Sequence, residues 1–267
     1  MADVRKWYNG YSWNGIDTVY NPYSVLNLFE KQSFGDHWFA TGTPTMLIKF
    51  MRKQESFLFN NLKISAELMD SYDLENLDLR TLLFQSGYLT VKKMDAKNGF
   101  YTLDYPNREV EQALSNYILA ELLGSSKGTT AIPVHDIKDA FFQNDVEKVV
   151  KIINSLLKDV PYMLLKGKKE DFYHAIVHIH FRYLGLLMDS EVMTSDGRMD
   201  VVVKTPTHIY IIEFKLNQSA EKAIEQIKTN RYAEKYVLEN KPIVLVGINF
   251  NSRKKGIGTW LVEQYIY

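Results

Sequence analysis

Three side chains in the last third of the chain have the types and spacing of a small hydrolytic site: Asp200, Glu213 and Lys215. Glu213 and Lys215 stand at the end of an apolar run that begins at Ile209, which is typical of a buried β-strand. Side chains alternate along a strand, so Glu213 and Lys215 share one face and Phe214 takes the other. Charges at such positions are costly unless they are paired or bound to a metal ion.

Asp200 lies on the preceding predicted strand, and its position relative to Glu213 depends on the connection between the strands. If residues 205–208, or only residues 206–207, loop out, Asp200 pairs directly with Glu213. Side chains opposed in this way have Cβ atoms about 4.5–5.5 Å apart. A loop of three residues would break this register.

Two opposed carboxylates repel, and a divalent cation between them removes the repulsion by taking both as oxygen ligands. Such a cation, Mg²⁺ or Mn²⁺, can polarise a phosphoryl oxygen, acidify a bound water and stabilise the leaving oxygen. Lys215 can orient the attacking water or neutralise charge that builds up on the phosphate. Removing either carboxylate should leave the stability of the metal-free domain unchanged or raised. The same spacing also fits an ordinary surface hairpin, because short patterns of this kind often arise by chance.

The surroundings of these residues resemble the PD-(D/E)XK nuclease superfamily. The resemblance rests on Gly197 before Asp200, on the strand end Glu213-Phe214-Lys215, and on a following helix that carries Gln226-Ile227 and Arg231-Tyr232-Ala233. It covers about residues 168–267 and is closest to the nuclease-like domain that ends many bacterial AAA-ATPase-like proteins. The fold it implies is a restriction-endonuclease-like αβββαβ domain with a mixed sheet.

The resemblance also implies an activity and a set of roles. The activity is metal-dependent hydrolysis of phosphodiester bonds, with DNA as the expected substrate and Mg²⁺ or Mn²⁺ as the cofactor. Asp200 and Glu213 would bind the metal, and Lys215 would be catalytic. Glu170, at the start of the domain's first helix, would be an accessory acid, and Gln226 would position water or substrate.

The first part of the chain resembles the closing part of the ATPase region of the same proteins. The likeness is carried by Trp7-Tyr8-Asn9-Gly10-Tyr11 and by Tyr20-Asn21-Pro22-Tyr23-Ser24-Val25. No Gly-x-x-x-x-Gly-Lys-Ser/Thr phosphate loop occurs in the sequence, so we expect no ATPase activity from these residues. We expect an ATPase region upstream in a full-length protein, and apolar surface exposed around Trp7, Tyr8 and Trp13.

Composition narrows the class of protein. Hydrophobic residues make up 46% and charged residues 24%, which is the balance of a folded globular chain. Without cysteine, disulfides, thiolate metal sites and a cysteine nucleophile are excluded. The absence of a long apolar stretch and of a signal-peptide core argues against a membrane partner and favours a cytoplasmic location. Because the formal net charge is zero, attraction to nucleic acid must be local. The nearest basic clusters are Lys166-Lys168-Lys169 and Arg253-Lys254-Lys255, although either also fits a solvated loop.

The pattern of elements predicts an α/β protein, α+β overall, with two domains. Residues 1–166 read as mainly helical, with a helix and a hairpin at residues 77–84, 88–92 and 100–103 that suggest a winged-helix-like unit. Residues 167–267 read as the nuclease-like domain. There the expected order is a helix at 171–187, strands at 191–194, 199–204 and 208–216, a long helix at 220–239, and an apolar strand at 242–248.

Two other readings remain open. His174 and His178 are four residues apart on a predicted helix, with Glu170 one turn earlier, so that face could hold zinc. The alternative to an enzyme is a non-catalytic nucleic-acid-binding or protein-interaction module that keeps a nuclease-like fold.

Overall fold

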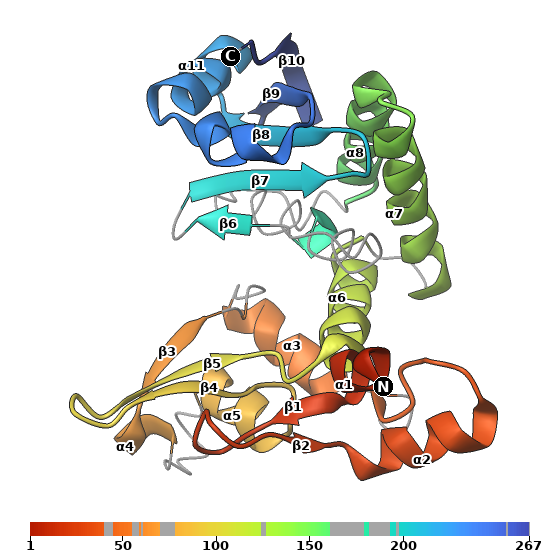
Figure 1. The fold of residues 1–267 in the computed structure, drawn as a ribbon, viewed down its shortest axis with the longest axis vertical. Helices are drawn as coiled ribbons and strands as arrows, with labels where there is room; N and C mark the ends of the chain where they lie inside the picture. The colour runs from red at the N-terminus through yellow and green to blue at the C-terminus, as the bar shows by residue number, and fades with distance from the viewer. Residues whose placement is uncertain are drawn as a thin grey trace. The chain divides into compact units, whose positions relative to one another are not determined.

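The structure is a computed structural model of the 267-residue chain. It describes residues 1–39, 45–54, 59, 61–69, 78–123, 127–160, 179–181, 193–195, 198–254 and 256–266. The chain forms two compact units, Met1–Ile118 and Leu119–Tyr267, which can be followed by colour in Figure 1. Among the described residues, no helix is both long and apolar enough to cross a lipid bilayer.

The first unit combines short helices with two small antiparallel sheets. One sheet pairs β1 with β2, and the other has the order β3-β5-β4. The predicted helix and hairpin at residues 77–103 are confirmed as α5, β4 and β5, and β3 adds a third strand beside β5. The elements are α1 (Ala2–Tyr8), β1 (Asn9–Tyr11), β2 (Val19–Tyr20), α2 (Pro22–Lys31), α3 (Thr45–Gln54), β3 (Leu62–Ser65), α4 (Ala66–Met69), α5 (Leu79–Gln85), β4 (Thr90–Asp95), β5 (Phe100–Asp104) and α6 (Arg108–Leu123), which runs on into the second unit.

Local chemistry accounts for the start of α2. The side chain of Asn21 accepts hydrogen bonds from the backbone N–H groups of Tyr23 and Ser24 at 3.1 and 3.2 Å, and Pro22 occupies the first helical position. An asparagine cap followed by proline at the first helical position is a common way to start a helix.

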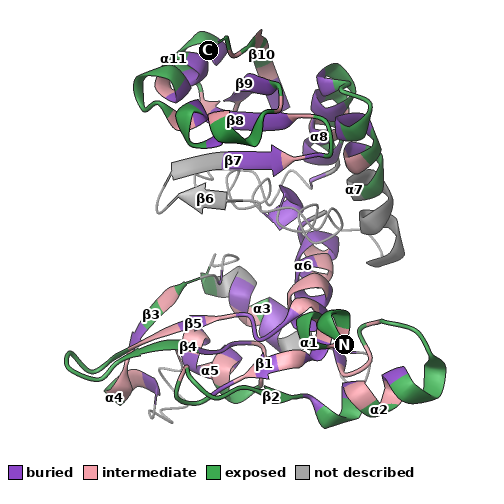
Figure 2. Ribbon diagram, viewed as in Figure 1, coloured by how far each residue is buried: buried purple, intermediate pink, exposed green. Residues whose placement is uncertain are grey.

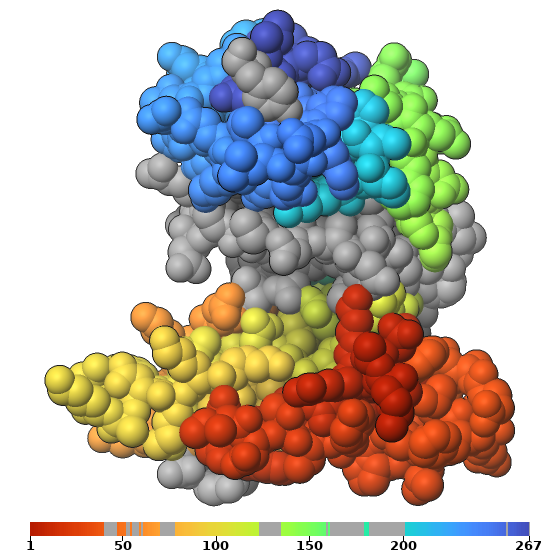
Figure 3. Space-filling view, viewed as in Figure 1, coloured from red at the N-terminus to blue at the C-terminus, as the bar shows by residue number. Residues whose placement is uncertain are grey.

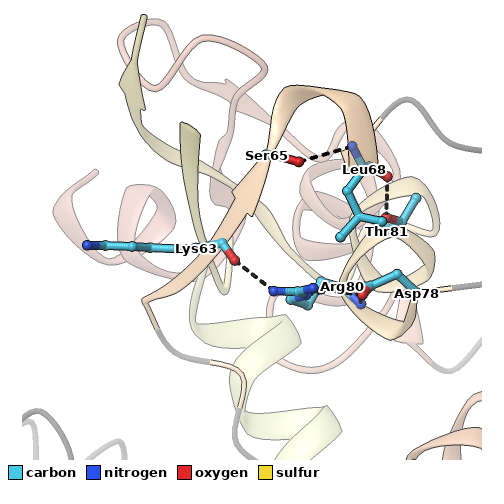
Figure 4. A network of polar contacts seen from close by, with 6 residues as sticks. All are labelled: Lys63, Ser65, Leu68, Asp78, Arg80 and Thr81. Carbon is cyan, nitrogen blue, oxygen red and sulfur yellow. Dashed lines mark hydrogen bonds and ion pairs between the residues drawn. The ribbon is translucent and has the colours of Figure 1, made fainter. Parts of the chain in front are cut away.

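Polar contacts tie α5 to the segment before it, as Figure 4 shows. Arg80 forms a forked ion pair with Asp78 and donates from Nη1 to the carbonyl of Lys63 at 2.9 Å. Thr81 Oγ1 donates to the carbonyl of Leu68 at 2.8 Å. These contacts fix the start of α5 against β3 and α4, and Arg80 holds the pKa of the Asp78 carboxyl below its usual range.

Glu109 is a buried acid that links separate parts of the first unit. Its carboxylate accepts hydrogen bonds from Ser24 Oγ, at 3.0 and 2.7 Å, and from the backbone N–H of Trp38 at 2.7 Å. The residue is 0% exposed. Burial raises the pKa of Glu109 more than these hydrogen bonds lower it.

The exposed apolar surface of the first unit differs in part from the expectation. Trp13 is 69% exposed, as expected, but Tyr8 is 0% exposed, so the expectation was wrong for Tyr8. The Tyr8 ring stacks near Phe34, and its hydroxyl donates to the carbonyl of Gly35 at 3.1 Å. The exposed apolar side chains extend along α2, which is largely green in Figure 2 and orange in Figure 3. On this helix they are Tyr23, Leu26 and Phe29.

The second unit is built on a mixed sheet with the order β10-β9-β8-β7-β6, in which only the β8–β9 pair is parallel. This confirms the predicted mixed sheet. Helix α11 packs on β8 and β9, and α8 packs on β10. The elements are α7 (Lys127–Phe142), α8 (Val146–Asp159), β6 (Met193–Ser195), β7 (Arg198–Lys204), β8 (Ile209–Leu216), α11 (Ala220–Thr229), the 3₁₀ helix η2 (Tyr232–Glu239), β9 (Ile243–Asn251) and β10 (Gly256–Gln264).

The core of this sheet explains the apolar runs in the sequence. In β8 and β9 nearly every side chain is buried, because α11 and η2 cover one face of the strands. Ile224 and Ile227 of α11 join Ile211 and Leu245 of the sheet in one cluster. Figure 2 shows β8 and β9 in the colour of buried residues.

Two features of the second unit differ from the expectation. The single helix predicted at residues 220–239 is wrong, because α11 ends at Thr229 and Arg231 adopts a left-handed conformation with φ 55° before η2 begins. Strand β10 was not predicted. The domain division at residues 166 and 167 stays a prediction, since residues 161–178 lie outside the described part. The structure itself groups α7 and α8 with the sheet.

The raised pKa of Glu109 gives a pH-dependent stability. The folded state favours the protonated carboxyl, so the free energy of unfolding should fall as the pH rises from 4.5 through the raised folded value. Replacement Glu109→Gln removes this titration, so its stability relative to wild type should improve progressively with pH over that range. Urea unfolding followed by tryptophan fluorescence at several pH values measures the difference.

The matched control for this measurement is Glu30→Gln, on the exposed side of α2. We expect its difference from wild type to show no such trend with pH. A pH-independent difference between wild type and Glu109→Gln would contradict the account of Glu109.

Candidate active site

The register of β7 and β8 places Asp200 opposite Glu213. Their Cα atoms are partners, and the same register continues to the pair Lys204 and Ile209. Residues 205–208 form the connection, which is closed by a hydrogen bond from the N–H of Thr205 to the carbonyl of His208 at 2.9 Å. Of the connections weighed from the sequence, the four-residue loop is the one observed. For Asp200 the structure describes the backbone.

Glu213 is a buried carboxylate with one satisfied oxygen. The residue is 2% exposed, and Oε1 accepts a hydrogen bond from Lys215 Nζ at 2.7 Å. Oε2 is buried and has no hydrogen-bond partner among the described residues. A buried polar atom without a partner costs about 1–3 kcal/mol, more if it is charged, so this oxygen marks a place where a further ligand would stabilise the protein.

Lys215 joins the acid to the following helix. Its ammonium lies 2.7 Å from Glu213 Oε1 and 2.5 Å from Gln226 Oε1, and its side chain is 15% exposed. The shared face of Glu213 and Lys215, expected from strand alternation, is therefore confirmed by direct contact. Gln226 comes from α11, so the site is assembled from a strand and the helix that covers it.

Close packing of α11 on β9 brings Gln226 to Lys215. Ser219 caps α11 by accepting a hydrogen bond from the N–H of Lys222 at 3.2 Å. Gly247 of β9, the strand partner of Glu213, lies under the first turn of this helix. A Cβ atom at Gly247 would be 2.4 Å from the carbonyl oxygen of Ala220. Because no side chain larger than hydrogen fits there, the helix can approach the strand closely enough to complete the site.

The chemistry of these groups fits a hard divalent cation. Mg²⁺ and Mn²⁺ prefer carboxylate oxygens, and Glu213 offers a buried oxygen that lacks another partner among the described residues. Asp200 lies opposite it in the strand register. Within the described part of the chain, no group of three or more His, Asp or Glu side chains is placed to hold a metal by itself.

Several residues singled out from the sequence lie outside the described residues. These are Glu170, both histidines of the zinc hypothesis, His174 and His178, and the basic cluster Lys166-Lys168-Lys169. Their roles stay predictions. Of the second basic cluster, Arg253 and Lys254 are described, and both are exposed.

Two asparagines near the site were not singled out from the sequence. Asn249 is 6% exposed and lies beside Lys215 in the strand register. Asn217 follows Lys215 by two positions and has a left-handed backbone with φ 53°. A polar residue inside the apolar strand and an asparagine after a strand end are signals that could have drawn attention to both.

Comparison with known families agrees with this geometry. Residues 168–260 match a family described as the PD-(D/E)XK nuclease superfamily. This segment is a PD-(D/E)XK nuclease superfamily domain. Asp200, Glu213, Lys215 and Gln226 all fall within it, and members of the superfamily are typically metal-dependent phosphodiesterases.

One relative extends the similarity beyond the nuclease-superfamily domain. The chain is 30% identical over 271 residues to a protein of Azotobacter chroococcum mcd 1 named as an uncharacterized protein in the vnfD 5′ region. The match covers 98% of this chain and 52% of that protein, so the chain spans about half the length of this relative. No solved structure gives a significant match.

Because of the contacts of Glu213, we expect replacement of Asp200 and replacement of Glu213 to affect the stability of the protein differently. Asp200→Asn should leave the melting temperature of the metal-free protein unchanged or raised, because it relieves repulsion between opposed carboxylates. For Glu213→Gln the structure reverses the expectation of unchanged or raised stability, since Lys215 would lose the contact of its ammonium with the Glu213 carboxylate in a buried place. We expect the free energy of unfolding to fall by about 3 kcal/mol.

Thermal and urea unfolding in EDTA would measure both variants. If Asp200→Asn destabilises the metal-free protein as much as Glu213→Gln does, Asp200 holds the fold together and the repulsion argument is wrong.

Proposed function

We propose that this protein is a metal-dependent nuclease that hydrolyses phosphodiester bonds, with DNA as the substrate and Mg²⁺ or Mn²⁺ as the cofactor. The observation that carries the proposal is the buried Glu213 carboxylate, with one oxygen on Lys215 and the other without a described partner. Its position opposite Asp200 on the neighbouring strand supports a shared ion. Membership of residues 168–260 in the nuclease superfamily supports the reaction class.

In this proposal Asp200 and Glu213 would hold the cation, which would supply Lewis-acid activation of the phosphate and of a water molecule. Lys215 has two tasks. It neutralises part of the negative charge around Glu213 in the resting protein, and it offers N–H donors to the phosphate as charge builds up in the transition state. Gln226 holds the ammonium of Lys215 from the helix side, and its amide N–H₂ can direct a water or a phosphate oxygen.

The rival function is a non-catalytic module that binds nucleic acid or protein through a nuclease-like fold. The zero formal net charge fits this rival, because a strong global attraction to nucleic acid is missing. The site chemistry favours the enzyme. A module that only binds nucleic acid or protein would not need this buried carboxylate. Burying it costs free energy, and one of its oxygens has no hydrogen-bond partner among the described residues.

The resemblance of the first unit to the end of an ATPase region adds a proposed partner. In a longer protein of this kind, an upstream ATPase region would act together with the nuclease domain. This chain would have no ATPase activity of its own, since it lacks the glycine-rich loop that cradles phosphates.

A cleavage assay tests the proposed function. Duplex DNA, single-stranded DNA and RNA are incubated with wild type and with Asp200→Ala in Mg²⁺, in Mn²⁺ and in EDTA. We expect cleavage only with a divalent ion, and a loss of at least about 100-fold in Asp200→Ala, since the metal should lose a ligand. Wild-type cleavage that persists in EDTA, or equal cleavage by both proteins, would overturn the proposal. Binding without cleavage under every condition would favour the rival.

A further inference from the structure

A basic turn joins β9 to β10 in the second unit. Arg253 and Lys254 are exposed there, while the backbone of the turn is held by Asn251. The Asn251 side-chain oxygen accepts hydrogen bonds from the N–H groups of Arg253 and Lys254, at 3.0 Å each. The backbone of Arg253 and Lys254 is therefore held in place, and their two cationic side chains are exposed.

Asn217 attaches this turn to the strand that carries Lys215. Its side-chain oxygen accepts hydrogen bonds from the backbone N–H and from the hydroxyl of Ser252, at 3.0 Å each. Its own N–H donates to the carbonyl of Phe250 at 2.8 Å. Because Asn217 follows Lys215 by two positions, these bonds fix the turn relative to the candidate site.

Asn249 strengthens the same connection from inside the sheet. Its side-chain amide makes two hydrogen bonds with the backbone of Gln218. It accepts from the N–H at 2.9 Å and donates to the carbonyl at 3.1 Å. Asn249 is also the strand partner of Lys215. The loop between Lys215 and α11 is thus clamped to β9, only a few residues before the basic turn.

The spacing suits a linear polyanion. Adjacent strands are about 4.8 Å apart, and the chain from Asn249 to Arg253 can extend by no more than about 13 Å. Phosphates on one strand of duplex DNA follow each other every 3.4 Å or so along the axis. The turn therefore lies within a few nucleotides of a phosphate placed at Lys215. Since the whole chain has no formal net charge, local cations of this kind must supply the attraction.

We propose that Arg253 and Lys254 form a binding subsite for the phosphodiester backbone a few nucleotides from the bond that is cut, and that Asn217 is the positioning residue that holds this subsite. The proposal rests on the proposed nuclease function. Contacts of this kind go to phosphates, so the subsite would strengthen binding equally for different base sequences.

Salt-dependent binding tests the subsite. The affinity for a 20-base-pair DNA duplex is measured by fluorescence anisotropy in EDTA over a range of salt concentrations, so that no cleavage is possible. Loss of two phosphate contacts should reduce the slope of log K against log salt by about 1.8 in the double variant Arg253→Ala/Lys254→Ala. Single-stranded DNA and duplex RNA of the same length show which backbone the subsite accepts.

The matched control is Lys31→Ala/Lys97→Ala, which removes the same charge from two exposed lysines of the first unit, on α2 and in the β4–β5 turn. This control should keep the wild-type slope. An equal reduction in both double variants would mean a general charge effect and would overturn the subsite.

Asn217→Gly tests the positioning role without straining the backbone, because glycine readily adopts the positive φ found here. The exchange removes both bonds to Ser252. If Asn217 positions the turn, the affinity lost on removing Arg253 and Lys254 should be at least about threefold smaller in the Asn217→Gly background than in wild type. A purely structural role for Asn217 would leave the two losses equal, whatever its effect on the melting temperature.

The outcomes also separate this subsite from the proposed function. Metal-dependent cleavage by wild type, with an unchanged salt slope in Arg253→Ala/Lys254→Ala for every nucleic acid, would overturn the subsite and leave the nuclease proposal standing. Failure of wild type to bind or cut any of these nucleic acids would overturn both.

Discussion

A carboxylate inside a β-sheet needs partners for both of its oxygens, and the candidate site is organised around this need at Glu213. Lys215 satisfies one oxygen at 2.7 Å, while the other is buried without a described partner. Asp200, opposite in the strand register, adds a second acid rather than a second donor. A divalent cation is the ligand that would resolve this arrangement, because it binds oxygens of both acids and offsets their charge.

The rest of the second unit can be understood as the support for that arrangement. The four-residue connection between β7 and β8 sets the register, and the parallel pairing of β8 with β9 places Gly247 beside Glu213. The absence of a side chain at Gly247 lets α11 approach and bring Gln226 to within 2.5 Å of Lys215. A shift in any of these elements would move Lys215 relative to the acid, so the geometry of the sheet and the chemistry of the site are inseparable.

The parts of the candidate site that depend on a local sequence pattern were predictable from the sequence. Strand alternation placed Glu213 and Lys215 on one face. The sequence left the length of the β7–β8 connection open, and the structure shows the register that pairs Asp200 with Glu213. The break after α11 was missed, although polar Asn230 and Arg231 occupy the positions that would continue the apolar spacing of Ile224 and Ile227, and Arg231 has a left-handed backbone. Strand β10 was missed because only its first two residues are buried, so the rest of the strand lacks a strong apolar pattern. The clamps made by Asn217 and Asn249 join segments far apart in the sequence, so no local pattern could show them.

The central claim is that the buried carboxylate of Glu213 binds a divalent cation, and diffraction tests it most directly. A crystal of the metal-free protein would be soaked in Mn²⁺, and an anomalous difference map would locate the ion. We predict a peak between about 2.0 and 2.6 Å from Glu213 Oε2, with Asp200 as a second ligand. A fully occupied Mn²⁺ site elsewhere, with Glu213 Oε2 bound only by water or by a protein donor, would contradict the account.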